Sequence, residues 1–151
     1  MRIPTVLAAA LVAGSLVGAA PAQANPAASG TGLIAFLAGA NEVPAGSGDP
    51  DARGVALVGI KPGSGRICYV IRVRNVDGTV DGAHIHAGRA RQEGPAVVEL
   101  APPASSGAVA ACKWVGKRLA AAIRKDPRKY YVNVHSTAFP DGALRGQLHK
   151  A

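Results

Sequence analysis

Short apolar runs, separated by glycine and proline, recur every ten to twenty residues or so along most of the chain. The runs that are long enough to form strands cover residues 33–40, 54–60, 67–75, 83–86, 96–100, 130–136 and 143–149. Frequent turn signals between short strands are typical of a β-sandwich or a β-barrel. The pattern therefore predicts an all-β domain.

Two connections and one helix complete this picture. The stretch KPGSG at 61–65 is a turn signal that predicts a hairpin, and FPDG at 139–142 is expected to join the last two strands. In WVGKRLAAAIRKDP, at 114–127, apolar residues recur every four positions until Asp126 and Pro127 end the pattern. This spacing predicts one short amphipathic helix before the last two strands.

Alternation within the strands predicts which side chains face the core. In AHIH, Ile85 is the apolar member, so His84 and His86 should point together to the opposite face. The same reasoning turns the polar residues of the other strands away from the core: Arg72, Arg74, Asn133, His135, Arg145, Gln147 and His149. A half-buried sheet shows this distribution without any functional site.

The N-terminus has the pattern of a secretory signal peptide, with Arg2, an apolar stretch over 6–20 and the small-residue signal Ala22-Gln23-Ala24. We predict a signal peptide at 1–24 with cleavage after Ala24, a flexible leader at 25–31 and a single domain at 32–151. The apolar stretch is too short to span a bilayer comfortably, and no transmembrane segment is expected in the mature chain.

The chain has two cysteines, Cys68 and Cys112. Because export favours disulfide formation, we expect them to form a disulfide, and the alternative is two buried thiols.

The chain carries a net charge of +8, which falls to +7 without Arg2. A basic protein favours polyanions. Cations of the predicted helix form either a solvated face or a patch for an anionic envelope polymer: Lys117, Arg118, Arg124 and Lys125. Few aromatic residues and export argue against nucleic acid.

The histidines suggest a metal site. His84 and His86 lie about 7 Å apart on one strand face, and His135, with His149 as a further candidate, could complete a copper or zinc site. Alternatively, the imidazoles hydrogen-bond to neighbouring strands or loop carbonyls, or act as a proton switch. No serine-nucleophile elbow, paired carboxylates or phosphate-binding loop is present, so no catalytic residues are predicted.

Four segments, in order, resemble the CHRD domain family: AGANEVPA, AHIHAG, GPAVVEL and YYVNVHSTAFPDGALRGQL. The resemblance covers about residues 32–148. It implies an immunoglobulin-like or superoxide-dismutase-like β-sandwich, and no established activity for most bacterial members. It also implies that Asn133, Arg145 and Gly146 are structural, with Arg145 bonded to loop carbonyls or to an acid such as Glu42 or Asp141.

Together these features predict an exported, non-enzymatic module that binds an unknown extracellular protein or an envelope polyanion, or has a structural role. The alternative is a copper- or zinc-binding protein, or a redox enzyme, that uses the histidines.

Overall fold

The computed structural model describes residues 31–61, 63–104 and 107–151. The predicted signal peptide, its cleavage site and the leader up to residue 30 lie outside this range, and Thr31 already belongs to the first strand. The elements are β1 Thr31–Ala38, β2 Arg53–Ile60, β3 Arg66–Arg74, β4 Val80–Ala87, β5 Ala96–Leu100, β6 Ala108–Trp114, α1 Lys117–Lys125, β7 Tyr130–Ser136, β8 Phe139–Gln147 and β9 His149–Lys150, with 3-10 turns at Gly39–Asn41 and Pro127–Lys129.

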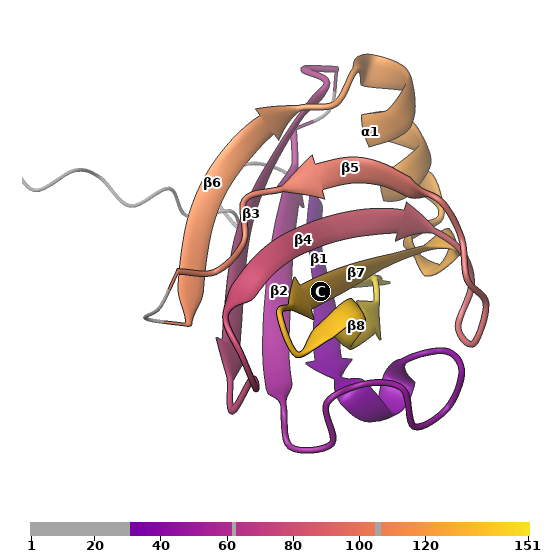
Figure 1. The fold of residues 1–151 in the computed structure, drawn as a ribbon. Helices are drawn as coiled ribbons and strands as arrows, with labels where there is room; N and C mark the ends of the chain where they lie inside the picture. Colours follow the sequence, from indigo (N-terminus) through magenta and orange to yellow (C-terminus); the bar gives the residue numbers. More distant parts are fainter. Residues whose placement is uncertain (1–30, 62, 105–106) are drawn as a thin grey trace, which may run out of the picture.

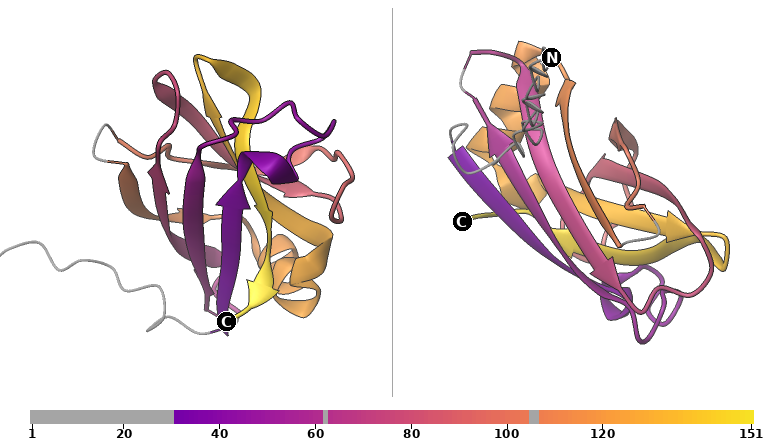
Figure 2. Two further views of the ribbon diagram at one scale, coloured as in Figure 1. Left: turned by 90° about the horizontal axis from the view of Figure 1, so that it is seen from below. Right: turned by 90° about the vertical axis from the view of Figure 1, so that its left-hand side faces the viewer.

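The strands form one antiparallel sheet in the order β5-β4-β7-β8-β1-β2-β3-β6, with β9 beside β1. Strands β8 and β1 pair only through Ala38 and Arg145. At this junction the sheet turns, so that β5-β4-β7-β8 forms one layer and β1-β2-β3-β6 the other, with strands that cross steeply (Figures 1 and 2). The predicted all-β sandwich with one short helix is confirmed.

Alternate side chains from both layers fill the core. Leu33, Ala35 and Leu37 of β1 are almost completely buried, and so are Ile85 of β4 and Val132 of β7, each from the inward parity of its strand. The apolar face of α1 adds Ala120 and Ile123. Of the helices in the described part of the chain, none has the length and apolar character needed to cross a bilayer. Burial of the apolar residues is the main force that holds the two layers together.

Sequence reasoning missed strand β6, whose residues AVAACKW are all partly or fully exposed, and did not separate β9 from β8. A small-residue edge strand lacks the alternation of large apolar and polar side chains from which strands are recognised. The helix consequently begins at Lys117 and not near Trp114. The backbone between them makes a turn, in which Gly116 has a φ of 88° and donates its N–H to the Gly65 carbonyl.

The predicted disulfide is confirmed, because Cys68 of β3 and Cys112 of β6 face each other in register and are bonded. The bond closes a loop with a sequence separation of 44. On the chain-entropy account, a loop of this length stabilises the folded state by about 4 kcal/mol. The edge strand β6 is thus covalently attached to the sheet.

The outward direction of a polar side chain does not by itself expose it to solvent. Asn133 and Arg145 do point away from the core, but they are only 4% and 3% exposed. Two loops cover this part of the outer face: the Arg145 guanidinium donates to the Gln92 carbonyl from one loop, and Asn41 of the other donates to the Arg145 carbonyl. Arg72 and Arg74, which no such loop covers, are exposed as predicted.

Candidate functional site

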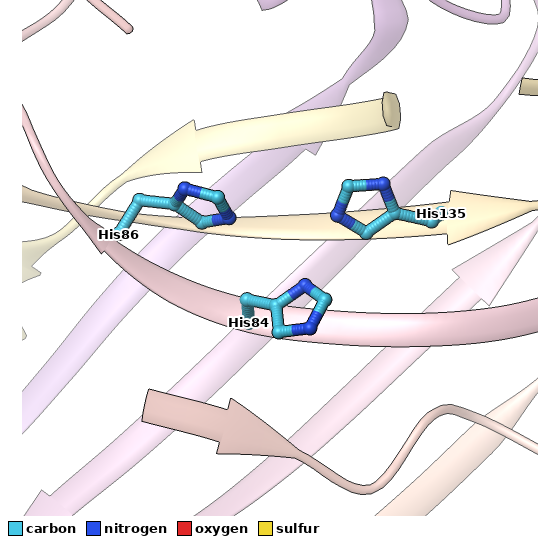
Figure 3. Close-up of side chains that lie close together, drawn as sticks. All are labelled: His84, His86 and His135. Atoms are coloured by element: carbon cyan, nitrogen blue, oxygen red, sulfur yellow. The ribbon is translucent and has the colours of Figure 1, made fainter. Parts of the chain in front are cut away.

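Three histidines meet on the outer face of the β4-β7 pair. His84 and His86 come from β4 and His135 from β7, with ring centroids 5.0 Å apart for His84 and His135 and 5.6 Å apart for His84 and His86 (Figure 3). One nitrogen from each ring lies within 4.8 Å of the other two. His149, the further candidate, is on β9 beside β1 and does not belong to this tri-histidine cluster.

The register between β4 and β7 explains the convergence. His84 faces Asn133, whereas His135 faces Gly82, so His135 is a diagonal neighbour of His84. A Cβ atom at Gly82 would lie 3.3 Å from the His135 Cβ and 3.4 Å from its ring carbon Cδ2. Because Gly82 has no side chain, the His135 ring can occupy the space beside His84.

Hydrogen bonds determine which nitrogen of each ring is available. His86 Nδ1 lies 2.8 Å from the Gly94 carbonyl oxygen, and His135 Nδ1 lies 2.9 Å from that of Pro140. A carbonyl only accepts, so each Nδ1 carries the proton and donates it, which leaves a lone pair on Nε2 of the neutral ring. Both Nε2 atoms, and Nδ1 of His84, are buried without a hydrogen-bond partner.

Electrostatics favour the neutral form of His84 and His86. Burial, followed by the proximity of His135 and His86, lowers the pKa of His84, although the carboxylate of Glu99 opposes this effect. Burial also lowers the pKa of His86, with the bond to Gly94 acting in the opposite direction. Neutral imidazole is the form that coordinates metals, so these rings need not lose a proton before binding near neutral pH.

The distances are close to those of a metal site. Two nitrogens that each bond an ion at about 2.1 Å are at most about 4.2 Å apart. The ligand atoms of the tri-histidine cluster all lie within 4.8 Å of one another, so side-chain rotations that bring them closer by less than about an ångström reach this separation. The carbonyls that bond the two Nδ1 atoms would serve as the outer partners that orient metal-bound histidines.

Tyr131 separates this cluster from Arg145. The His86 ring stacks on Tyr131 with centroids 4.8 Å apart, and the Arg145 guanidinium carbon lies 3.6 Å from the centre of the same ring. Since β7 lies between β4 and β8, Tyr131 stands between the imidazole and the cation. The cation does lower the pKa of His86, but it does not contribute to the cluster itself.

The residues implied to be structural lie beside the cluster, on β7 and β8. The Nη2 atom of Arg145 donates to the carbonyls of Gln92, at 2.9 Å, and Arg89, at 3.4 Å, and forms no salt bridge with Glu42 or Asp141. A Cβ atom at Gly146 would lie 2.2 Å from the Phe36 carbonyl oxygen. This glycine therefore allows β8 to approach β1 at the junction of the two layers.

Glu42 was missed as a titrating group, because sequence reasoning considered it only as a partner for Arg145. Its side chain is 5% exposed, and Oε1 has no hydrogen-bond partner. Burial raises the pKa of Glu42 from the ordinary 4.5 to about 7, although the positive charge of Arg145 opposes the shift. An isolated acid followed by a proline segment gives no signal of burial in the sequence.

The predicted anion-binding patch lies elsewhere. All four of its residues are exposed on α1: Lys117, Arg118, Arg124 and Lys125. Asp126, at the end of the helix, forms a 3.1 Å salt bridge with Lys129. The exposure of the four cations fits a solvated face and an anion-binding patch equally well.

Comparison with protein families gives one match: the model of the CHRD domain matches residues 33–148, from β1 to the residue before β9. No curated protein shows significant sequence similarity to the chain. The matched range includes the tri-histidine cluster, Glu42, Arg145 and both cysteines.

Proposed function

Because the chain belongs to the CHRD domain family, we propose that it is an exported, non-enzymatic binding module that holds a copper or zinc ion through His84, His86 and His135. Membership of an extracellular family and the disulfide support export, with the signal peptide removed after Ala24. The family match by itself supports only a binding or structural module. The metal assignment depends on the cluster.

One observation carries the metal assignment: three buried imidazole nitrogens without hydrogen-bond partners face one another. An unpaired buried polar atom is unfavourable, by about 1 to 3 kcal/mol. Three such atoms in one place are therefore best explained by a shared ligand with a positive charge. A purely structural role would also require hydrogen bonds from these rings. The bonds of His86 and His135 to the backbone carbonyls of Gly94 and Pro140 use the other nitrogen of each ring.

The donor set points to the kind of ion. Imidazole nitrogen suits zinc and copper, whereas calcium and magnesium require oxygen ligands. Among the described residues, the cluster contains no carboxylate. Three histidines also leave a coordination position for water or for a group from a partner.

Calorimetric titration of the purified protein with Cu²⁺ and with Zn²⁺ tests the proposal. We expect a single site with a Kd below about micromolar, and a loss of at least about a hundredfold in affinity for His86→Ala and His135→Ala. His149→Ala is the matched control, because this histidine lies outside the cluster. The metal assignment is wrong if neither ion binds below micromolar, or if His149→Ala weakens binding as much as the other two variants.

A further inference from the structure

The outer face of the layer β1-β2-β3-β6, on the opposite side of the sandwich from the tri-histidine cluster, is unusually apolar. All of the large hydrophobic side chains that the described chain exposes lie on this face: Phe36 at 68%, Leu57 at 37% and Trp114 at 69%. The register brings Phe36 and Leu57 together with other apolar residues, since Phe36 pairs with Val55, and Leu57 lies between Ile34 and Val70. Trp114 lies at the far corner of the same face, opposite Arg66. Single exposed apolar residues are common, but a contiguous group marks an interaction site.

Arginines border these apolar residues. The strand partners that share the face include Arg53, Arg72 and Arg74 at one end and Arg66, opposite Trp114, at the other. We call this set of residues the arginine-rimmed face: Ile34, Phe36, Arg53, Val55, Leu57, Arg66, Val70, Arg72, Arg74, Ala110 and Trp114. It contains no acidic residue, and within the described ranges none of its arginines forms a salt bridge.

The three arginines at one end surround a hollow. Arg53, Arg72 and Arg74 line an open cavity of about 280 Å³, together with Gly54, Val55 and Val73. The Arg53 guanidinium is held in place by bonds to the carbonyls of Pro50 and Ala52. Guanidinium groups recognise phosphate oxygens in a bidentate manner, so the hollow has the chemistry of a phosphate site with an apolar border.

We propose that the arginine-rimmed face docks on the surface of an anionic lipid bilayer. Phosphate headgroups would contact Arg53, Arg72 and Arg74, while Phe36 and Trp114 enter the boundary between headgroups and acyl chains. Exposed apolar and aromatic groups beside basic residues are the composition of interfacial membrane binding. A second copy of the chain fits poorly, because face-to-face packing would bring two sets of unpaired arginines together.

Docking in this manner has a consequence for the other side of the molecule. The two layers lie on opposite sides of the sandwich (Figure 2). The tri-histidine cluster lies on the outer face of β4 and β7 in the other layer, so it would remain directed toward the aqueous phase. The membrane proposal nevertheless does not depend on metal binding. It uses different residues and a different partner.

Trp114 is the only tryptophan in the sequence, and it lies on the face, so its fluorescence reports docking without a label. The full exported protein is titrated with vesicles of phosphatidylcholine plus phosphatidylglycerol, and with phosphatidylcholine alone. We expect a blue shift with the anionic vesicles only, and quenching of Trp114 by lipids brominated on the acyl chains. An arginine near an anionic surface contributes about a factor of five to the partition coefficient.

Two matched double variants locate the contact. Arg72→Gln with Arg74→Gln should weaken vesicle binding about 25-fold. Arg118→Gln with Arg124→Gln removes the same charge from α1 and should weaken it less than about threefold, through the loss of long-range attraction alone. Phe36→Ser should weaken binding about tenfold without altering thermal unfolding, because this side chain is 68% exposed.

Equal losses from the two double variants would overturn the proposal, since binding would then follow net charge and not this face. A blue shift that rises with protein concentration in the absence of vesicles would also overturn it and assign the face to a second copy. No shift of Trp114 with anionic vesicles would leave an acidic protein partner as the occupant and likewise refute membrane docking.

Discussion

Glu42 provides a direct test of the electrostatics beside the tri-histidine cluster. This carboxyl is buried next to Arg145 and Gly142, and its pKa is raised from 4.5 to about 7, mainly by burial. The folded protein therefore binds this proton more tightly than the unfolded chain does. The stabilising contribution is complete below pH 4.5 or so and is lost as the pH rises through about 7.

The size of the effect follows from the shift. Each pKa unit corresponds to about 1.4 kcal/mol, so the difference between 4.5 and about 7 amounts to about 3 kcal/mol. Glutamine at position 42 resembles the protonated carboxyl at every pH. We expect Glu42→Gln to match the wild type near pH 4.5 and to exceed its free energy of unfolding by about 3 kcal/mol at pH 8.5.

Urea unfolding at pH 4.5, 6, 7 and 8.5, or thereabouts, measures this difference for both proteins. The lowered pKa values of His84 and His86 destabilise both proteins as the pH falls below about 6.5, because the unfolded chain then binds more protons. The contribution of these histidines is the same in Glu42→Gln and in the wild type, so it cancels when their free energies of unfolding are compared. Asp51→Asn is the control, since the Asp51 side chain is exposed. A pH-independent difference between Glu42→Gln and the wild type would refute the reasoning.

Three further changes test the packing around the site. Gly82→Val should displace His135 and weaken Cu²⁺ or Zn²⁺ binding at least about tenfold by calorimetry. Gly32→Val, whose new Cβ would meet only Ala151, should leave the affinity unchanged. Equal affinities of the two variants would contradict the close approach of Gly82 to His135. Replacing both cysteines by serine should lower the free energy of unfolding by up to about 4 kcal/mol, and an unchanged urea midpoint would be inconsistent with a stabilising bond. Arg145→Met leaves loop carbonyls without their donor and should lower the free energy of unfolding by about 2 to 3 kcal/mol. Arg72→Met, at an exposed position, should lower it by less than about 0.5 kcal/mol. Similar losses for the two variants would argue against a structural role for Arg145.

Local patterns predicted much of the fold, because strands and helices leave a period in the sequence. Alternation around Ile85 and Val132 placed His84, His86 and His135 on the outward side of their strands, and the four-residue spacing up to Ile123 predicted α1. Strand β6 was not predicted, because its alanines give no difference in polarity between the two faces of the strand. Turn residues predicted the hairpin of β2 and β3, whose strands pair from Ile60 and Ile67 onward. The expectation that FPDG at 139–142 joins the last two strands was wrong, because Phe139 already pairs with Ser136 and these four residues belong to β8.

The sequence by itself determined the composition of each strand face and the candidates for disulfide and metal ligands, and it predicted a signal peptide at the N-terminus. Tertiary structure alone decided which faces are covered. Parity assigned Asn133, Arg145 and Arg72 equally to outward faces, yet two loops bury the first two and leave the third exposed. The register between β4 and β7 likewise decided that His135 lies diagonal to His84, opposite Gly82. Exposure and register depend on contacts between segments far apart in the chain, and a local period carries no information about them.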